Sequence, residues 1–246
     1  PVMEYVPLTT SEGIINTQYT MTLLEELGLL KMDFLGLRTL TVIRDAVAEI
    51  KRNTGVTVDI DHLPEEPKVY QLISQGKTEG VFQLESNGMK QFMKELQPTC
   101  LEDLIAGISL YRPGPMDFIP KYIEGKNDPE HIRYTHPALE PILKNTYGCI
   151  VYQEQVMQIV RDLAGYSLGR SDLVRRAMSK KKADVMAQER KNFVYGDEKT
   201  VKGCVANGIP AEVAEQIFDE MTDFAKYAFN KSHAACYAVV AYQTAW

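Results

Sequence analysis

The chain has 246 residues, of which 45% are hydrophobic and 24% charged, and its formal net charge is −6 at pH 7. This composition is typical of an ordinary globular protein and excludes a disordered or fibrous chain. Single domains commonly run to roughly 100–200 residues, so one large domain or two smaller ones would fit, and we expect two packed lobes. The acidic balance argues weakly against a nucleic-acid partner, because phosphate binding needs positive charge where the backbone passes.

The cysteines show neither the paired short spacing of a zinc site nor the density of a disulfide scaffold. They are Cys100, Cys149, Cys204 and Cys236. We expect reduced core thiols of an intracellular protein. No basic patch followed by an apolar stretch opens the chain, and no apolar run approaches the roughly 20 residues that span a bilayer. The sequence therefore predicts a cytoplasmic protein with no membrane partner.

The first elements in chain order are a short helix, a strand and a longer helix. Apolar residues predict the short helix over 23–27, and alternation over 29–35 is typical of a buried strand. Apolar positions at three- and four-residue spacing predict an amphipathic helix over 37–53, with Gly55 as its stop signal.

The next helix has a predicted start and a predicted end. Thr99 and Glu102 have capping-box spacing before an apolar run, which places the start near Cys100. The sequence Arg-Pro-Gly-Pro at 112–115 predicts a stiff turn that ends the helix.

The second half of the chain is expected to be nearly all helix. We expect Ser171 and Ser232 to act as N-caps and Pro210 to occupy a first turn. Helical patterns fit residues 152–164, 171–179, 183–195, 210–223 and 232–246.

Asp33 is a carboxylate between apolar neighbours. Burying it is costly unless it is paired or binds a metal. One interpretation is a salt bridge to Lys31 or Arg38, or a cap for the following helix, and the pattern alone favours this one. The other interpretation is a ligand for Mg²⁺, which takes one or two carboxylates together with substrate phosphates.

A two-metal site needs further carboxylates, and Asp59 and Asp61 are the nearest candidates along the chain. They lie in a polar loop between Gly55 and Pro64, where Asp most often makes turns or caps. We interpret them as structural. A metal-dependent phosphoesterase would instead require Asp33, Asp59 and Asp61 to converge.

A basic stretch runs from residue 170 to residue 191. On a helix, Arg176 and Lys180 are four residues apart and point the same way. The stretch is either a solvated helix face or an anion site, since two arginines with nearby lysines suit a triphosphate. Its basic residues are Arg170, Arg175, Arg176, Lys180, Lys181, Lys182, Arg190 and Lys191.

Polar residues at 230–233 precede the last predicted helix. Lys231 and the amides that follow the cap could bind an anion together. The alternative is a well-capped helix, in which His233 is a hydrogen-bonded structural group.

Several sequence blocks together closely resemble the alpha subunit of bacterial DNA polymerase III, a C-family replicative DNA polymerase. The resemblance is specific because many distinctive blocks occur in the right order, whereas any one alone would be weak. The blocks are KMDFLGLRTL at 31–40, VFQLES at 81–86, GMK at 88–90, YRPGP at 111–115, YQEQVM at 152–157, RRAM at 175–178, KKK at 180–182 and FNKSH at 229–233.

The resemblance implies an internal palm and fingers fragment that is mainly α with a small β contribution. Residues 1–59 would be the C-terminal part of a nucleotidyltransferase-like palm, and residues 60–246 a helical fingers domain truncated at its C-terminal end. In this family three palm aspartates hold two Mg²⁺ ions, and the block around Asp33 supplies the third. The other two belong to an Asp-x-Asp motif on an upstream strand, which this sequence lacks, since Asp59 and Asp61 fall in the wrong block.

The resemblance also assigns roles to fingers residues. Six are expected to contact the triphosphate and sugar of the incoming nucleotide: Arg175, Arg176, Lys180, Asn230, Lys231 and His233. Four more are expected to order the templating strand or the fingers themselves: Gln83, Ser86, Lys90 and Arg112.

The implied activity is that of a DNA-directed DNA polymerase, which adds deoxynucleotides to a primer 3′-hydroxyl by two-metal nucleotidyl transfer. Its partners would be primer-template DNA, deoxynucleoside triphosphates and other replicase subunits, including a sliding clamp. The fragment alone is expected to be inactive and to expose an apolar edge where the rest of the palm packs. The alternative is a non-catalytic helical module that binds nucleotides or DNA.

Overall fold

The computed structural model describes residues 1–32, 34–179, 183–197 and 199–246. The predictions for Asp33 and for Lys180 to Lys182 therefore fall outside the described residues. The chain divides into two units, Pro1–Val42 and Ile43–Trp246.

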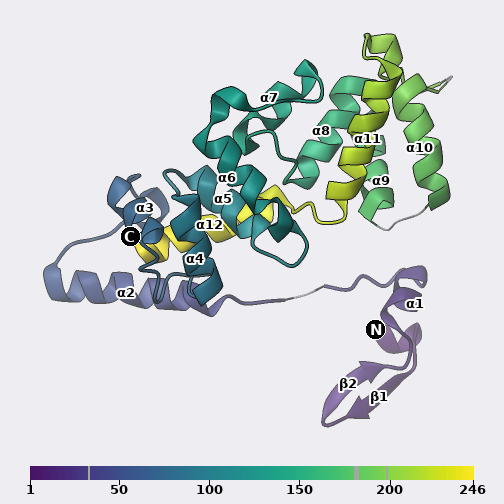
Figure 1. Cartoon of the computed structure of the whole chain (residues 1–246). Coiled ribbons are helices and arrows are strands. Elements are labelled where there is room, and N and C mark those ends of the chain that lie inside the picture. Colours follow the sequence, from purple (N-terminus) through teal and green to yellow (C-terminus); the bar gives the residue numbers. More distant parts are fainter. Residues whose placement is uncertain (33, 180–182, 198) are drawn as a thin grey trace. The chain divides into compact units, whose positions relative to one another are not determined.

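The first unit contains a β-hairpin that the sequence analysis did not predict (Figure 1). Strand β1 (Leu8–Ser11) pairs antiparallel with β2 (Ile14–Thr17), and Ser11 lies opposite Ile14. The two-residue loop, Glu12 and Gly13, has φ of +52° and +80°, as a hairpin turn that matches the strand twist requires. The 3-10 helix η1 (Val2–Glu4) precedes the hairpin and helix α1 (Met21–Glu26) follows it, the latter as predicted.

The predicted strand over 29–35 was wrong for the described residues of that segment, which have no regular structure. A strand needs a neighbouring strand for its backbone and a core for its apolar face, and this segment has neither among the described residues. The apolar side chains of Leu30, Phe34 and Leu35 are 80%, 91% and 92% exposed. These apolar side chains are thus exposed, and the packing of the rest of a palm against them stays a prediction.

Helices dominate the rest of the chain (Figure 1), which confirms the mainly α prediction. The helices are α2 (Arg38–Thr54), α3 (Pro67–Ser74), α4 (Asn87–Leu96), α5 (Leu101–Leu110), α6 (Ile119–Asn127), α7 (Glu140–Leu143), α8 (Gln153–Ala164), α9 (Leu168–Ser179), α10 (Ala183–Tyr195), α11 (Ala211–Ala225) and α12 (Lys231–Ala245). Short 3-10 helices join them: η2 (Ile60–His62), η3 (Pro115–Phe118), η4 (Pro129–His131), η5 (Pro137–Leu139), η6 (Lys144–Thr146) and η7 (Val205–Asn207). None of the helices in the described residues is long and apolar enough to cross a membrane.

Two predicted serine caps are wrong because each helix begins before the serine. Helix α9 starts near Ser167, whose hydroxyl accepts from Arg170 N at 3.3 Å, and Ser171 is buried inside the helix. Helix α12 is capped by Asn230, whose side chain accepts from His233 N at 2.8 Å, and not by Ser232.

The start of α5 is where the sequence predicts it, but the carboxylate that bonds to the preceding chain is Asp103 and not Glu102. Asp103 accepts from Thr99 N at 2.8 Å, so Asp103 replaces Glu102 in the predicted capping pair. Lys126 Nζ lies 2.9 Å from the same Asp103 carboxylate and offsets its buried charge.

Two hydrophobic cores form within the second unit. One gathers α3, α4, α5 and α12, where Ala234, Ala238 and Ala241 are fully buried. The other gathers α7 to α11. Small alanine side chains let α12 approach closely the helices that surround it. Helix α12 is thus a central element of the first core.

The cysteines are all free, but only Cys149 and Cys204 are fully buried. Burial raises the pKa of the Cys149 thiol to about 11 and that of Cys204 to about 12, so both stay protonated at neutral pH. Cys236 is exposed and Cys100 half-buried, so the prediction of four core thiols was wrong for these two.

The buried amide of Gln155 fixes the chain just before α8. Its Oε1 accepts from Val151 N at 2.8 Å and from Tyr152 N at 3.0 Å. Its Nε2 donates to Thr146 Oγ1 at 2.7 Å. Both ends of the amide are therefore satisfied inside the protein.

Replacing Gln155 with Leu should lower the free energy of unfolding by about 2–4 kcal/mol, because two buried backbone N–H groups lose their acceptor. Chemical denaturation measures the change. The matched control is Gln158→Leu on the same helix, where the side chain is only partly buried and a change within about 1 kcal/mol is expected. Equal losses in the two variants would contradict this role of Gln155.

Candidate functional site

The starts of helices α8 and α12 are joined by their backbones. Phe229 N donates to Val151 O at 3.0 Å, and Gln153 N donates to Phe229 O at 2.9 Å. These bonds form a parallel bridge between Tyr152 and Phe229. Two helix N-termini, each with partial positive charge, therefore lie next to each other.

Glu154 of α8 holds the first turn of α12. Its carboxylate oxygens accept from Lys231 N, both at 3.1 Å, and its Oε1 accepts from Asn230 Nδ2 at 3.2 Å. A carboxylate at a helix N-terminus is stabilised by the unpaired amides there. The start of α12 thus already binds one anionic group, and it belongs to the protein.

Arg175 of α9 reaches the same place through Gln153. Its Nη1 donates to Gln153 Oε1 at 3.0 Å, and Gln153 Nε2 donates to Ala228 O at 3.1 Å. Arg175 Nη2 also lies 2.7 Å from Asp172 Oδ1. The neighbouring Arg176 contacts the other oxygen of Asp172 at 2.7 Å, and its side chain is 61% exposed.

Aromatic rings line the other side of the bridge. The guanidinium of Arg112 lies 4.2 Å from the centre of the Phe229 ring, and Arg112 Nη2 donates to Tyr227 O at 2.7 Å. Burial lowers the pKa of Arg112 below its ordinary value. The His233 ring packs 5.4 Å from Phe229 and 4.2 Å from Tyr237, measured between ring centres.

The ammonium group of Lys231 contacts the first turn of α5 and the residue that precedes α8. The Nζ atom lies 3.1 Å from a Glu102 oxygen and 5.2 Å from the centre of the Tyr152 ring. We name the group Arg112, Arg175, Asn230, Lys231 and His233 the bridge cluster. The structure therefore brings five of the ten predicted fingers residues together around one backbone bridge.

The remaining described candidates near α4 form a separate group. Ser86 caps α4 by accepting from Met89 N at 3.2 Å, and Lys90 Nζ lies 2.5 Å from Glu79 Oε1. Gln83 has φ of +65°, in the left-handed region, which is uncommon for a residue with a side chain. This group and the bridge cluster are linked by aromatic packing, since the neighbouring Phe82 ring lies 5.1 Å from Tyr237.

Much of the basic stretch forms internal ion pairs instead of one charged face. Arg170 pairs with Glu189 at 3.2 Å and with Asp197. Arg190 pairs with Glu215 and Asp219, at 3.2 and 3.1 Å, and the bond to Asp219 raises the pKa of Arg190. These two arginines join α9 and α11 to neighbouring segments, so the expectation that the stretch acts as one anion-binding face was wrong for them.

The structural interpretation of Asp59 is confirmed. Its carboxylate accepts from Asp61 N at 3.2 Å and lies 3.0 Å from His62 Nδ1. The bond to His62 holds the pKa of Asp59 below its usual value. Among the described residues, no group of three or more His, Cys, Asp or Glu side chains could hold a metal ion.

Sequence reasoning missed three residues on which the bridge cluster depends: Gln153, Glu154 and Phe229. The signal was present, because Gln153 and Glu154 are polar residues in the first turn of a predicted helix. Their partners are about 75 residues away, which no local pattern reveals.

The stability contributed by Asp172 should disappear in acid. The Arg175 guanidinium donates to this carboxylate and lowers its pKa below 3.8. A lowered folded-state pKa means that the contribution is complete above the unfolded value and is lost as the pH falls through the folded one. Asp172→Asn should therefore destabilise the protein at pH 7. The difference in free energy of unfolding between this variant and the native chain should close below about pH 4.

Urea denaturation between pH 7 and pH 3 checks this prediction. Asp162→Asn is the matched control, because Asp162 pairs only with the exposed Arg161 among the described residues and should change little. A gap for Asp172→Asn that stays constant with pH would contradict the expected ion pair.

Comparison with known proteins gives one family. Residues 39–200 match the model of the bacterial DNA polymerase III alpha subunit finger domain. The chain is 47% identical over 243 residues to DNA polymerase III subunit alpha of Staphylococcus aureus strain MRSA252, and 46% identical to that of Staphylococcus epidermidis strain ATCC 12228. Each match covers 98% of this chain and 22% of the relative, so the chain spans about a fifth of these relatives. The chain therefore belongs to the bacterial DNA polymerase III alpha subunit family, and its residues 39–200 correspond to the finger domain.

Proposed function

We propose that the chain forms the fingers and adjoining palm of a DNA-directed DNA polymerase that adds deoxynucleotides to a primer 3′-hydroxyl. The observation that carries the proposal is the bridge cluster, in which cations and two helix N-termini converge in a chain of this family. We assign residues 1–59 to the palm and 60–246 to the fingers, so that residues 39–59, which the finger-domain model also matches, lie at the proposed boundary.

The triphosphate of the incoming nucleotide is the anion for which the bridge cluster is suited. Arg175 can bind phosphate oxygens in bidentate fashion, and Lys231 adds a point charge beside the amides of α12. Arg176 adds positive charge on α9, and Lys180 is proposed as a further contact to the triphosphate. Before nucleotide binds, Asp172 and Glu102 hold the two cations in place, so a triphosphate replaces acceptors that are already there.

Two further members of the cluster suit the sugar. Asn230 offers an amide, and His233 is fixed by two aromatic neighbours. Gln83, Ser86, Lys90 and Arg112 order the fingers or the templating strand, and the contacts of Arg112 with Tyr227 and Phe229 favour the fingers themselves.

Asp33 is proposed as one ligand of a two-metal Mg²⁺ site whose other ligands lie outside this sequence. With Mg²⁺ bound, such a site activates the primer hydroxyl and stabilises the pyrophosphate that leaves. The isolated chain would then be inactive. In the whole cytoplasmic polymerase, primer-template DNA is held mainly through its phosphates, and a sliding clamp and other replicase subunits bind elsewhere.

A non-catalytic module that binds nucleotides or DNA is the second candidate. It would bind phosphate groups through Arg175 and Arg176 with no metal requirement at Asp33. The two candidates share nucleotide binding at the bridge cluster and differ in what Asp33 does.

Nucleotide binding tests the bridge cluster in this chain. Arg175→Ala should weaken binding of a fluorescent deoxynucleoside triphosphate at least about tenfold, because a charge-assisted bidentate contact is lost. Arg161→Ala on α8 is the matched control, since Arg161 is half-exposed and pairs with Asp162. Arg175→Lys keeps the charge but not the planar guanidinium. Its affinity for the nucleotide should lie between those of the native chain and of Arg175→Ala. Equal affinity of the Arg175→Ala and Arg161→Ala variants would overturn the assignment.

Primer extension tests the role of Asp33. The assay uses a Staphylococcus aureus alpha subunit in which this sequence replaces the matching segment. The two segments are 47% identical. Asp33→Asn should reduce extension more than about 100-fold, because even partners of metal ligands contribute 10–100-fold. Asp45→Asn, at an exposed position on α2, should leave the rate unchanged. Extension that survives Asp33→Asn would favour a non-metal role for this residue.

A further inference from the structure

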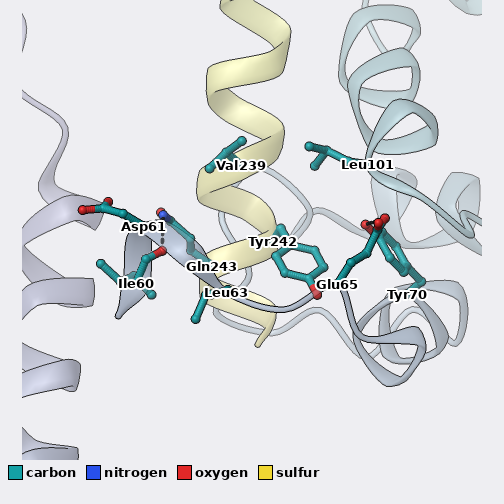
Figure 2. Close-up of a pocket in the computed structure, with 9 residues that line it drawn as sticks. All are labelled: Ile60, Asp61, Leu63, Glu65, Tyr70, Leu101, Val239, Tyr242 and Gln243. Atoms are coloured by element: carbon teal, nitrogen blue, oxygen red, sulfur yellow. Dashed lines mark hydrogen bonds between the residues drawn. The ribbon is translucent and has the colours of Figure 1, made fainter. Parts of the chain in front are cut away.

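A pocket lies beside the last turns of α12, at the opposite end of that helix from the bridge cluster. It encloses about 230 Å³, which is below the roughly 300–1,000 Å³ of sites for drug-sized ligands. Its apolar walls are Leu63, Leu101, Val239 and the ring of Tyr242. Figure 2 shows Glu65 and Tyr70 at one end of the pocket and Asp61 at the other, with Tyr242 between.

The hydrogen-bond donors that line this pocket are used by the protein itself. Tyr70 Oη donates to Glu65 Oε1 at 2.8 Å, Tyr242 Oη donates to Pro64 O at 2.8 Å, and Gln243 Nε2 donates to Ile60 O at 3.0 Å. Burial raises the pKa of Tyr70 far above its ordinary value, and the Glu65 carboxylate adds to this, so the hydroxyl remains a donor.

Several hydrogen-bond acceptors of the pocket, in contrast, have no partner among the described residues. One oxygen of Glu65 and both oxygens of Asp61 have no hydrogen-bond partner in the part of the chain that the structure describes. Neither carboxylate forms an ion pair there, whereas the nearby Asp59 pairs with His62. Both side chains are exposed, so water solvates these oxygens, and a ligand that supplies several N–H donors and a positive charge can replace that water.

We propose that this pocket binds a small amidinium or guanidinium cation with a flat apolar body. The planar cation pairs with the Glu65 carboxylate, which Tyr70 holds in place, and the apolar body lies against Tyr242, Leu101 and Val239. Asp61 adds negative potential at the far end. The volume suits a single ring or a short alkyl stem.

The site is separate from the proposed nucleotide contacts. Lys231 and Tyr242 are eleven residues apart on α12, which corresponds to about 16 Å along a helix. Binding at the pocket does not rest on the proposed polymerase function, and a variant such as Arg175→Ala should bind the cation as the native chain does.

Calorimetric titration of the chain with benzamidine, and with its neutral isostere benzamide, tests the proposal. Benzamidine should bind at least about tenfold more tightly than benzamide, and Glu65→Gln should remove that difference, because the charged bidentate pair is lost. Glu66→Gln, the same change one residue along and outside the lining, should leave the affinity unchanged. Asp61→Asn should weaken binding less than Glu65→Gln.

Three results would overturn the proposal. They are equal affinity for benzamidine and benzamide, benzamidine binding that Glu65→Gln leaves intact, and no heat of binding at millimolar benzamidine. Thermal melting of each variant verifies that the chain is folded, since Glu65 and Asp61 are exposed and their replacement should not affect the core.

Discussion

Two backbone hydrogen bonds between the segments that precede α8 and α12 organise the second unit. They join Val151 and Gln153 to Phe229 and thereby connect the two hydrophobic cores. Side-chain contacts alone would fix this junction less firmly, because a backbone bridge leaves no rotamer freedom. The positions of Arg175, Asn230 and Lys231 all follow from this bridge, through Gln153 and Glu154.

The bridge cluster is charged but internally compensated. Each main cation has a carboxylate partner: Asp172 for Arg175 and Glu102 for Lys231. Glu154 compensates the amides at the start of α12. Such an arrangement keeps the cations ordered without a ligand, and phosphate oxygens can take over contacts that the carboxylates now make. It also shows that a chain with a net charge of −6 can gather the cations that the proposed anion site needs.

Sequence reasoning predicted the helices well, because their apolar spacing is a local property. The helix at 37–53 and the five helices of the second half all appear, within a few residues of their expected bounds. The strand at 29–35 failed because the described residues provide no neighbouring strand to pair with it. Ser171 and Ser232 failed as caps because both helices begin earlier, where Ser167 and Asn230 accept from the first-turn amides.

The candidate site was predictable only in part. Basic residues and polar helix starts were visible in the sequence, and the family resemblance selected among them. The pairing of Arg170 with Asp197, and of Arg190 with Asp219, depends on segments 27 and 29 residues away in the chain. Those contacts separate structural arginines from candidates for ligand binding, and no local pattern contains that information.

Hydrogen–deuterium exchange of this chain, with and without a mixture of the four deoxynucleoside triphosphates, tests the central claim most directly. If the junction of α8 and α12 binds the triphosphate, amides at 152–155 and 230–234 should gain protection more than any others. Protection that falls elsewhere, for example only along 183–195, or no protection at saturating nucleotide, would contradict the account.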